Sequence, residues 1–183
     1  MTQTDWQASS VQLAGLSKQA KAHGLLDAAL AKCSQATREA FENPYGARWH
    51  PGAQLTEFGE ALLTLTDPVT LENINYEMTK ASFGSILRPV VQVALALTGR
   101  SPGTLFARVP TSLPQALKHV TCAWEPEGKS AGALRFTYPT AVSPYSGVAW
   151  RGVVRFLSEL AGQPARVTEA IIEGNTLRLS VAW

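Results

Sequence analysis

Hydrophobic positions change their spacing roughly two thirds of the way along the chain. Up to about residue 116, apolar residues recur every three or four positions, which is the spacing of one face of an α-helix. From Leu117 onward, much of the chain alternates apolar and polar residues, as a half-buried β-strand does. The change predicts a mainly helical part over residues 1–116 and a hairpin–helix–hairpin part over residues 117–183.

The first part contains several helical stripes. Gly24 is expected to interrupt the first, and Asp67 followed by Pro68 has the character of an N-cap and a first helical residue. Residues 86–97 are apolar on nearly every side, which is typical of a buried helix, so we expect them to form the central helix after a break at Gly84. The predicted helices cover about 10–41, 54–65, 68–82 and 86–97, with a helical turn over 102–108 and a loop over 43–52.

The second part predicts two hairpins around one helix. Ser143 and Pro144 repeat the pattern of N-cap and first residue, and an amphipathic stripe runs from there to Gly162. Gly174 and Asn175 lie between two alternating runs and favour a two-residue hairpin turn. The predicted strands cover 117–125, a run around 134–138, 167–173 and 176–183.

This order predicts an α+β fold, in which an N-terminal helical layer packs on a four-stranded antiparallel sheet built as β-hairpin, helix, β-hairpin. The N-terminal helices are expected to cover one face of the sheet, because nothing else would bury residues 86–97. The 183 residues match the size of one domain, and no repeat divides them. We therefore expect a single domain over residues 1–183.

The charge balance and the lengths of the apolar runs argue against nucleic acid and a membrane as partners. The 16 basic and 14 acidic residues give a net charge of +2, which is too small to indicate nucleic acid. The apolar run over 90–97 is far shorter than the roughly 20 residues that span a bilayer, and the N-terminus has no apolar signal core. These features predict a cytoplasmic protein without a membrane partner. Charged residues make up only 16%, which favours an apolar surface that a partner covers.

Residues with catalytic or metal-binding chemistry are scattered. His23, His50 and His119 have no metal-ligand spacing, and neither do Cys33 and Cys122. The chain has neither a nucleophile elbow nor a phosphate-binding glycine loop. The sequence therefore predicts no metal, no cofactor and no enzymatic activity.

Aromatic residues in two loops are the candidate ligand-binding residues. Tyr45, Trp49 and His50 lie in the first loop, and Tyr138 and Tyr145 lie beside the proline-bounded connection at 139–144. Tyrosine and tryptophan combine apolar area with a hydrogen-bonding group, which suits an amphipathic small molecule or a peptide. The alternative is that both loops only cap the core.

Trp150 and Val154 lie at the flank of the apolar stripe of the second-part helix. A tryptophan in that position either packs beneath a loop or belongs to an interface. We expect these two residues to form an interface, with a symmetric homodimer as the commonest outcome.

The C-terminal segments 133–139, 147–162 and 165–183 resemble the end of a myxobacterial family of similarly short proteins. That family is in turn similar to the superfamily of haem–nitric-oxide-binding domains, 4-vinyl-reductase domains and TRAPP transport-complex subunits. The resemblance implies a helical layer over a four-stranded sheet, with a ligand cavity between them and a non-catalytic sensing or scaffold role. The Tyr-x-Ser-x-Arg motif of the haem-binding relatives does not occur in this sequence, so no functional residue is carried over and no haem is expected.

Three classes of function follow. The favoured hypothesis is a non-catalytic binding module for an apolar or amphipathic small ligand or a peptide, in sensing or as a pathway accessory protein. The alternative is a protein-interaction or dimerisation scaffold without a cavity. An enzyme is the least favoured class, because no catalytic constellation is found.

Overall fold

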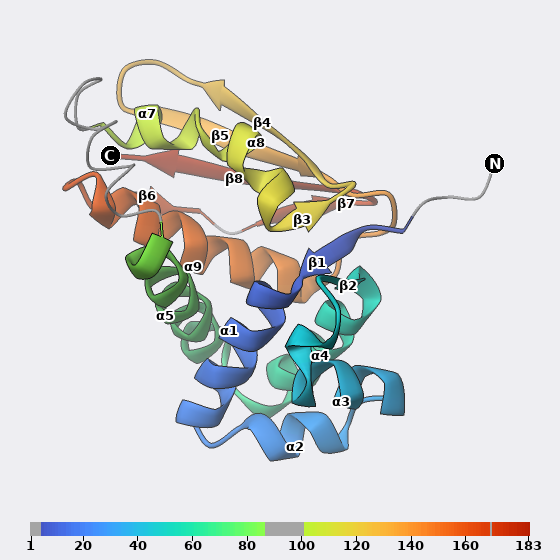
Figure 1. The fold of residues 1–183 in the computed structure, drawn as a ribbon. Coiled ribbons are helices and arrows are strands. Elements are labelled where there is room, and N and C mark those ends of the chain that lie inside the picture. Colours follow the sequence, from blue (N-terminus) through green and yellow to red (C-terminus); the bar gives the residue numbers. More distant parts are fainter. Residues whose placement is uncertain (1–4, 87–100, 169) are drawn as a thin grey trace.

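A computed structural model describes residues 5–86, 101–168 and 170–183, which form helices packed against one face of an antiparallel sheet (Figure 1). The α+β class predicted from the sequence is confirmed. The helices are α1 (Ser10–Ala22), α2 (Leu26–Ala31), α3 (Gln35–Glu42), α4 (Gly52–Leu65), α5 (Pro68–Ile86), α7 (Pro102–Phe106), α8 (Val109–Ser112) and α9 (Pro144–Leu160), with 3-10 turns η1 (Pro44–Gly46) and η2 (Leu113–Gln115). The strands are β1 (Gln7–Ser9), β2 (Trp49–Pro51), β3 (Leu117–Lys118), β4 (Thr121–Pro126), β5 (Ala131–Thr137), β6 (Arg166–Val167), β7 (Ile171–Glu173) and β8 (Thr176–Ala182).

Two long helices begin as the sequence predicts. The Asp67 carboxylate accepts hydrogen bonds from the backbone N–H groups of Val69 and Thr70, both at 2.9 Å, at the start of α5. The Ser143 hydroxyl accepts the backbone N–H of Tyr145 at 3.1 Å at the start of α9. Each cap satisfies N–H groups that have no partner inside the helix.

The predicted break at Gly84 is wrong, because α5 continues through it to Ile86. The break at Gly24 is confirmed: its φ of 70° lies in the left-handed region, and α1 ends just before it. The expected central helix over 86–97 lies almost wholly outside the described residues. No helix in the described ranges is long and apolar enough to cross a membrane.

A second, three-stranded sheet with the order β2–β1–β3 was not predicted. It replaces part of the expected loop over 43–52, and it takes Leu117 and Lys118 out of the expected strand over 117–125. His119 separates β3 from β4 because its φ of 62° is incompatible with an extended strand. The predicted single strand is therefore two short strands in different sheets.

The main sheet has the order β4–β5–β8–β6, and β7 pairs with β8 beyond β6. β6 and β7 lie along the same edge of β8, and together they take the place of the strand that was predicted over residues 167–173. Val167 lies opposite Val181, and Ile171 lies opposite Arg178. The register against β8 therefore shifts by one residue between β6 and β7, as it does across a β-bulge.

The two faces of the main sheet differ in chemistry. Phe136 on β5 lies opposite Leu177 on β8, Leu134 lies opposite Leu179, and all four are fully buried. The opposite face carries charged residues such as Arg135 and is not covered in this way. Only one face of the sheet therefore belongs to the core, as the period of two predicts.

α9 lies directly on this face, and so does α7 of the predicted helical part, whose Phe106 ring lies 5.1 Å from Trp124 of β4. The Trp150 ring of α9 stacks on Phe136 with centroids 3.9 Å apart. α1 to α5 lie on the side of α9 that faces away from the sheet (Figure 1), and α4 and α5 contact α9 directly. Among the described helices, α4 and α5 are thus linked to the sheet through α9.

α9 crosses α5 at very short range because Gly152 has no side chain. A Cβ at Gly152 would lie 2.4 Å from the Glu72 carbonyl oxygen and 2.8 Å from the Tyr76 nitrogen. Arg155 of α9 donates a hydrogen bond to the Glu72 carboxylate at 2.9 Å, and Arg151 pairs with the other oxygen of this carboxylate at 3.0 Å. The crossing therefore combines backbone contact with a partly buried ion-pair cluster.

We predict that Gly152→Ala lowers the free energy of unfolding by about 1–3 kcal/mol, since its methyl group meets backbone atoms that cannot move independently. Gly15→Ala in α1 is the matched control. Its methyl group meets the flexible Met78 side chain at 2.9 Å, so its effect should stay within about 1 kcal/mol, the gain from replacing a helical glycine. Urea unfolding measures both. Equal stability of the two variants would contradict the tight crossing.

Candidate functional site

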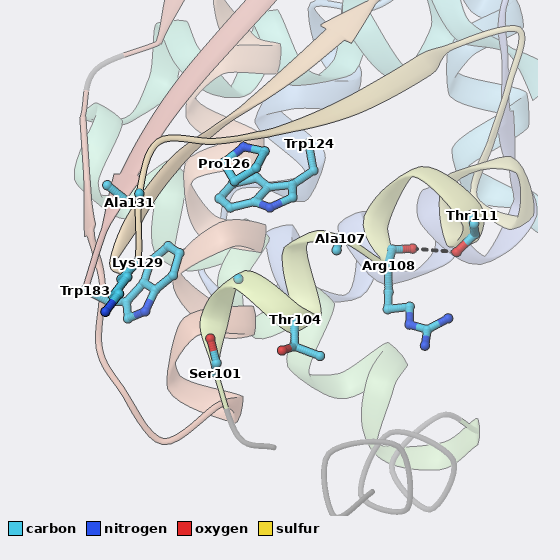
Figure 2. Close-up of a pocket in the computed structure, with 12 residues that line it drawn as sticks. Ser101, Thr104, Ala107, Arg108, Thr111, Trp124, Pro126, Lys129, Ala131 and Trp183 are labelled. Atoms are coloured by element: carbon cyan, nitrogen blue, oxygen red, sulfur yellow. Dashed lines mark hydrogen bonds between the residues drawn. The ribbon is translucent and has the colours of Figure 1, made fainter. Parts of the chain in front are cut away.

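A pocket of about 540 Å³ lies between the short helices α7 and α8 and the turn of the β4–β5 hairpin (Figure 2). It is on the apolar side of the sheet, because Trp124 of β4 lies opposite the fully buried Leu134 of β5. The C-terminal Trp183 lies at one end of the pocket and Thr111 at the other (Figure 2). Its apolar lining includes Trp124, Pro126 and Trp183, and its polar lining includes Ser101, Thr104, Arg108, Thr111 and Lys129.

Two indole rings form the apolar part of this pocket. The centroids of Trp124 and Trp183 lie 6.2 Å apart, and each ring also contacts Phe106 of α7, at 5.1 Å and 5.9 Å respectively. Phe106 is fully buried. The pocket wall is therefore anchored directly to the core.

Glycines let both indoles lie close to the backbone. A Cβ at Gly132 of β5 would be 2.3 Å from the Trp124 ring, so that ring covers the backbone of the neighbouring strand. A Cβ at Gly103 of α7 would be 3.1 Å from the Trp183 ring. Larger residues at these two positions would displace the rings.

The ionisable residues that line this pocket are both cations. Arg108 and Lys129 are exposed and lie at opposite ends of the pocket (Figure 2). The Thr111 hydroxyl donates a hydrogen bond to the Arg108 carbonyl oxygen at 2.9 Å. The pocket thus offers flat apolar surface between two positive charges.

A second pocket of about 270 Å³ is lined by Trp6, Thr140 and several acidic residues, but its main carboxylates serve the fold. Glu57 accepts hydrogen bonds from the Ser34 N–H and from the Ser34 and Thr37 hydroxyls at the start of α3. Burial acts to raise the pKa of Glu57, but these hydrogen bonds outweigh it and hold the pKa below its usual value. Glu60 accepts the Ser143 hydroxyl at 2.8 Å.

The residues of the predicted aromatic loop have different environments. Tyr45 is 72% exposed, whereas His50 is buried and its Nε2 lies 2.7 Å from the Pro44 carbonyl oxygen. The Lys118 ammonium lies 4.4 Å from the Trp49 ring centroid, which is a cation–π contact. None of the three predicted residues lines either pocket.

The two other predicted ligand-binding residues, Tyr138 and Tyr145, are buried in the core. The Tyr138 hydroxyl accepts the Trp150 indole N–H at 2.9 Å, and the Tyr145 hydroxyl donates to the Asn75 side-chain oxygen at 3.2 Å. Burial raises the pKa of Tyr138 to about 12 and raises the pKa of Tyr145 as well. Both hydroxyls therefore stay protonated and already have partners. Neither pocket brings the five predicted residues together, so their role in binding stays a prediction.

The predicted interface residues Trp150 and Val154 have partners within the chain, and their role in an interface stays a prediction. Val154 is fully buried. Trp150 is held between its stack on Phe136 and its hydrogen bond to Tyr138. The flank of the apolar stripe is part of the core because the sheet covers it, which the spacing along one helix does not reveal.

Trp124, Trp183, Arg108 and Lys129 were not among the ligand-binding residues predicted from the sequence. The sequence did contain a signal. Trp124 and Trp183 lie near the ends of two predicted strands, and Lys129 lies in the turn that follows the first of these strands. The contribution of α7 carries no such signal, because a five-residue helix is too short to show a period.

Potential axial ligands for haem are engaged elsewhere or badly placed. Such ligands are His, Cys, Met or Tyr, and none of these residue types lines the larger pocket. His23 and His119 are exposed, and His50 is bound to its own loop. Burial raises the pKa of Cys33 to about 11 and that of Cys122 to about 12, which disfavours the thiolate that binds iron. In the described ranges, no cluster of three or more His, Cys, Asp or Glu is suited to a metal ion.

Comparison with known proteins finds a shared fold. No protein-family model matches the chain, and no curated protein is detectably similar to it. The solved structure of an Fe(II) unliganded H-NOX protein from K. algicida superposes with a TM-score of 0.64 at 12% identity, covering 95% of each chain, and a mutant of that protein gives 0.66 with the same identity and coverage. An oxygen-binding H-NOX domain related to soluble guanylate cyclases gives 0.54 at 11% identity, covering 91% of this chain and 89% of the other.

This likeness confirms the predicted α+β architecture, and it agrees at the level of fold with the resemblance to haem–nitric-oxide-binding domains. The similarity to a myxobacterial family, to 4-vinyl-reductase domains and to TRAPP subunits stays a prediction. The residues described above do not fit haem, since the aromatic side chains between α9 and the sheet pack on one another, His23 and His119 lie at the surface, and His50 and Cys33 contact backbone carbonyl oxygens.

We therefore predict that the purified chain does not form a stoichiometric haem complex. Titration with haemin, followed by absorption spectroscopy, should give only the weak, unsaturated change of nonspecific association. The H-NOX protein from K. algicida is the positive control. A sharp, shifted absorption band that saturates at one haem per chain would contradict this prediction.

Proposed function

We propose that this chain is a non-catalytic sensing module that binds a small amphipathic molecule in the pocket between α7, α8 and the β4–β5 hairpin. The observation that carries the proposal is the pair of indole rings, Trp124 and Trp183, which line the pocket and contact the buried Phe106 behind it. The cytoplasmic location expected from the sequence is part of this proposal.

The size and lining of the pocket support a small molecule. Its volume of about 540 Å³ lies within the range of roughly 300–1,000 Å³ that is usual for small-molecule sites. Such sites combine apolar and aromatic walls with a few polar groups, and this pocket has both. Of the two ligand classes expected from the sequence, a small molecule therefore suits this site better than an extended peptide.

The lining supports binding without catalysis. Acid–base or nucleophilic chemistry usually requires a histidine, a carboxylate, a thiol or an activated hydroxyl with an adjacent base. The pocket contains hydroxyl groups of Ser101, Thr104 and Thr111, but none of the described residues that line it is a histidine, a cysteine, an aspartate or a glutamate. The hydroxyls thus have no base to activate them and can only donate or accept hydrogen bonds.

A sensing role follows from the connection between pocket and core. A ligand that prefers one arrangement of the two indoles shifts the protein toward that arrangement in proportion to its preference. Both indoles contact Phe106, so such a shift reaches α7 and the core directly. Sharing a fold with an oxygen-binding domain related to soluble guanylate cyclases supports this kind of role.

We predict that the neutral fluorescent probe phenylnaphthylamine binds in this pocket and that Trp183→Ala weakens its binding about tenfold, or ~1.4 kcal/mol, because one aromatic wall is lost. Ala107→Trp should weaken binding to a similar degree by filling the pocket. Ala107 is exposed, so this second variant is expected to keep the fold. Probe fluorescence excited through the protein's tryptophans measures the dissociation constants.

Trp49→Ala is the matched control, since Trp49 is a partly buried tryptophan that does not line the pocket. It should leave the affinity unchanged. Loss of binding in Trp49→Ala, with wild-type affinity in Ala107→Trp, would overturn the proposed site and favour the aromatic loop. Circular dichroism checks that each variant is folded.

A further inference from the structure

The cations of the larger pocket contrast with those of the surrounding sheet. Arg135 and Arg178, on the opposite face, each pair with a glutamate, at 2.8 Å and 2.5 Å. Within the described ranges, neither Arg108 nor Lys129 forms an ion pair. No acidic side chain in the described part of the chain therefore neutralises the positive charge at the pocket.

The glutamates nearest to the pocket in sequence are held away from it. Glu125 and Glu127 flank Pro126, which lines the pocket, but alternation along the strand places their side chains on the other face. There Glu125 pairs with Arg135, and Glu127 pairs with Arg178. The Arg135 guanidinium holds the pKa of Glu125 below its usual value, so the carboxylate stays ionised and paired. The hairpin thus separates its charges, with acids on one face and an unpaired cation on the other.

The two cations flank a flat apolar surface. Lys129 lies at the Trp183 end, Arg108 lies at the α8 end, and Trp124 is placed between them (Figure 2). A neutral apolar ligand would gain from the indoles but leave both charges unused. An anion with an aromatic or aliphatic body would use both features at once.

We infer that the ligand of this pocket is an amphipathic organic anion, whose apolar body packs on Trp124 and Trp183 and whose acidic group pairs with Lys129 or Arg108. The acidic group is a carboxylate, sulfonate or phosphate ester, since all three accept charge-assisted hydrogen bonds from these side chains. This inference rests on the proposed function and adds the sign of the ligand's charge. It also explains why the pocket pairs cations with hydroxyl donors and lacks any acid.

Two probes with the same ring framework separate the charge from the apolar body. Anilinonaphthalene sulfonate carries a sulfonate that phenylnaphthylamine lacks. Arg108→Gln and Lys129→Gln should each raise the dissociation constant of the sulfonate about two- to fivefold, the effect of one exposed charge, and should change that of the neutral probe less than twofold. High salt should reduce the affinity for the sulfonate in the wild type, and it should do so much less in a variant that carries both Arg108→Gln and Lys129→Gln.

Lys118→Gln is the matched control, because Lys118 is a partly buried lysine that contacts Trp49 and does not line the pocket. It should leave both dissociation constants unchanged. If the neutral probe binds and Ala107→Trp displaces it, but Arg108→Gln and Lys129→Gln leave the sulfonate's affinity unchanged, the anion inference is overturned while the proposed function stands. If neither probe binds to the folded chain, or Ala107→Trp affects neither, the proposed function fails and the inference fails with it.

Discussion

The crossing of α5 and α9 fixes the position of everything that packs on the sheet. Gly152 brings the two backbones into contact, so the separation of the helices is set by main-chain atoms and not by adjustable side chains. Glu72 then receives Arg151 and Arg155 from one helix, and removing either partner of such a partly buried pair leaves a charge that water reaches poorly. With α9 held in this way, the Trp150 ring can stack on Phe136, and the sheet takes its place relative to the helices.

Aromatic side chains occupy the space between α9 and the sheet. In this chain it is filled by Phe136, Trp150 and Tyr138, and Trp6 packs edge-on against Tyr138 at 5.4 Å. Interiors are close-packed, so a large prosthetic group and these side chains compete for the same volume. A fold shared with haem-binding proteins therefore carries no requirement for haem, since function resides in the site and not in the architecture.

Local signals in the sequence predicted those parts of the fold that depend on neighbouring residues. The pairs Asp67–Pro68 and Ser143–Pro144 start helices by bonding to N–H groups two or three residues away, and the alternation along β5 and β8 gives the buried face of the sheet. The strand over residues 167–173 was predicted as continuous, because the alternation of apolar and polar residues does not reveal a single extra residue. The sheet of β1, β2 and β3 could not be predicted, because strands of two or three residues carry no period and depend on partners far along the chain.

The candidate site was missed for the same reason. Its walls come from residues near 104, 125 and 183, which meet only where the hairpin pairs with β8 and Phe106 of α7 packs on Trp124 and Trp183. The aromatic loop that the sequence favoured consists instead of neighbours along the chain. The loop stood out because its aromatic residues are close in sequence. In the structure, however, His50, Tyr138 and Tyr145 have polar partners inside the fold.

The interrupted strand formed by β6 and β7 has a consequence for the behaviour of the protein in concentrated solution. An outer strand with a continuous row of free N–H and C=O groups is a template on which another chain can add, and it is a common origin of fibrous aggregates. Here the register against β8 shifts by one residue between Val167 and Ile171, so among the described residues of this edge the paired segments are only two and three residues long. An incoming strand that matched β7 would be out of step with β6, and Ile171, although 53% exposed, lacks a continuous edge beside it. The register shift between β6 and β7 thus disfavours ordered aggregation at this edge, which the exposed side chains of the edge would not do by themselves.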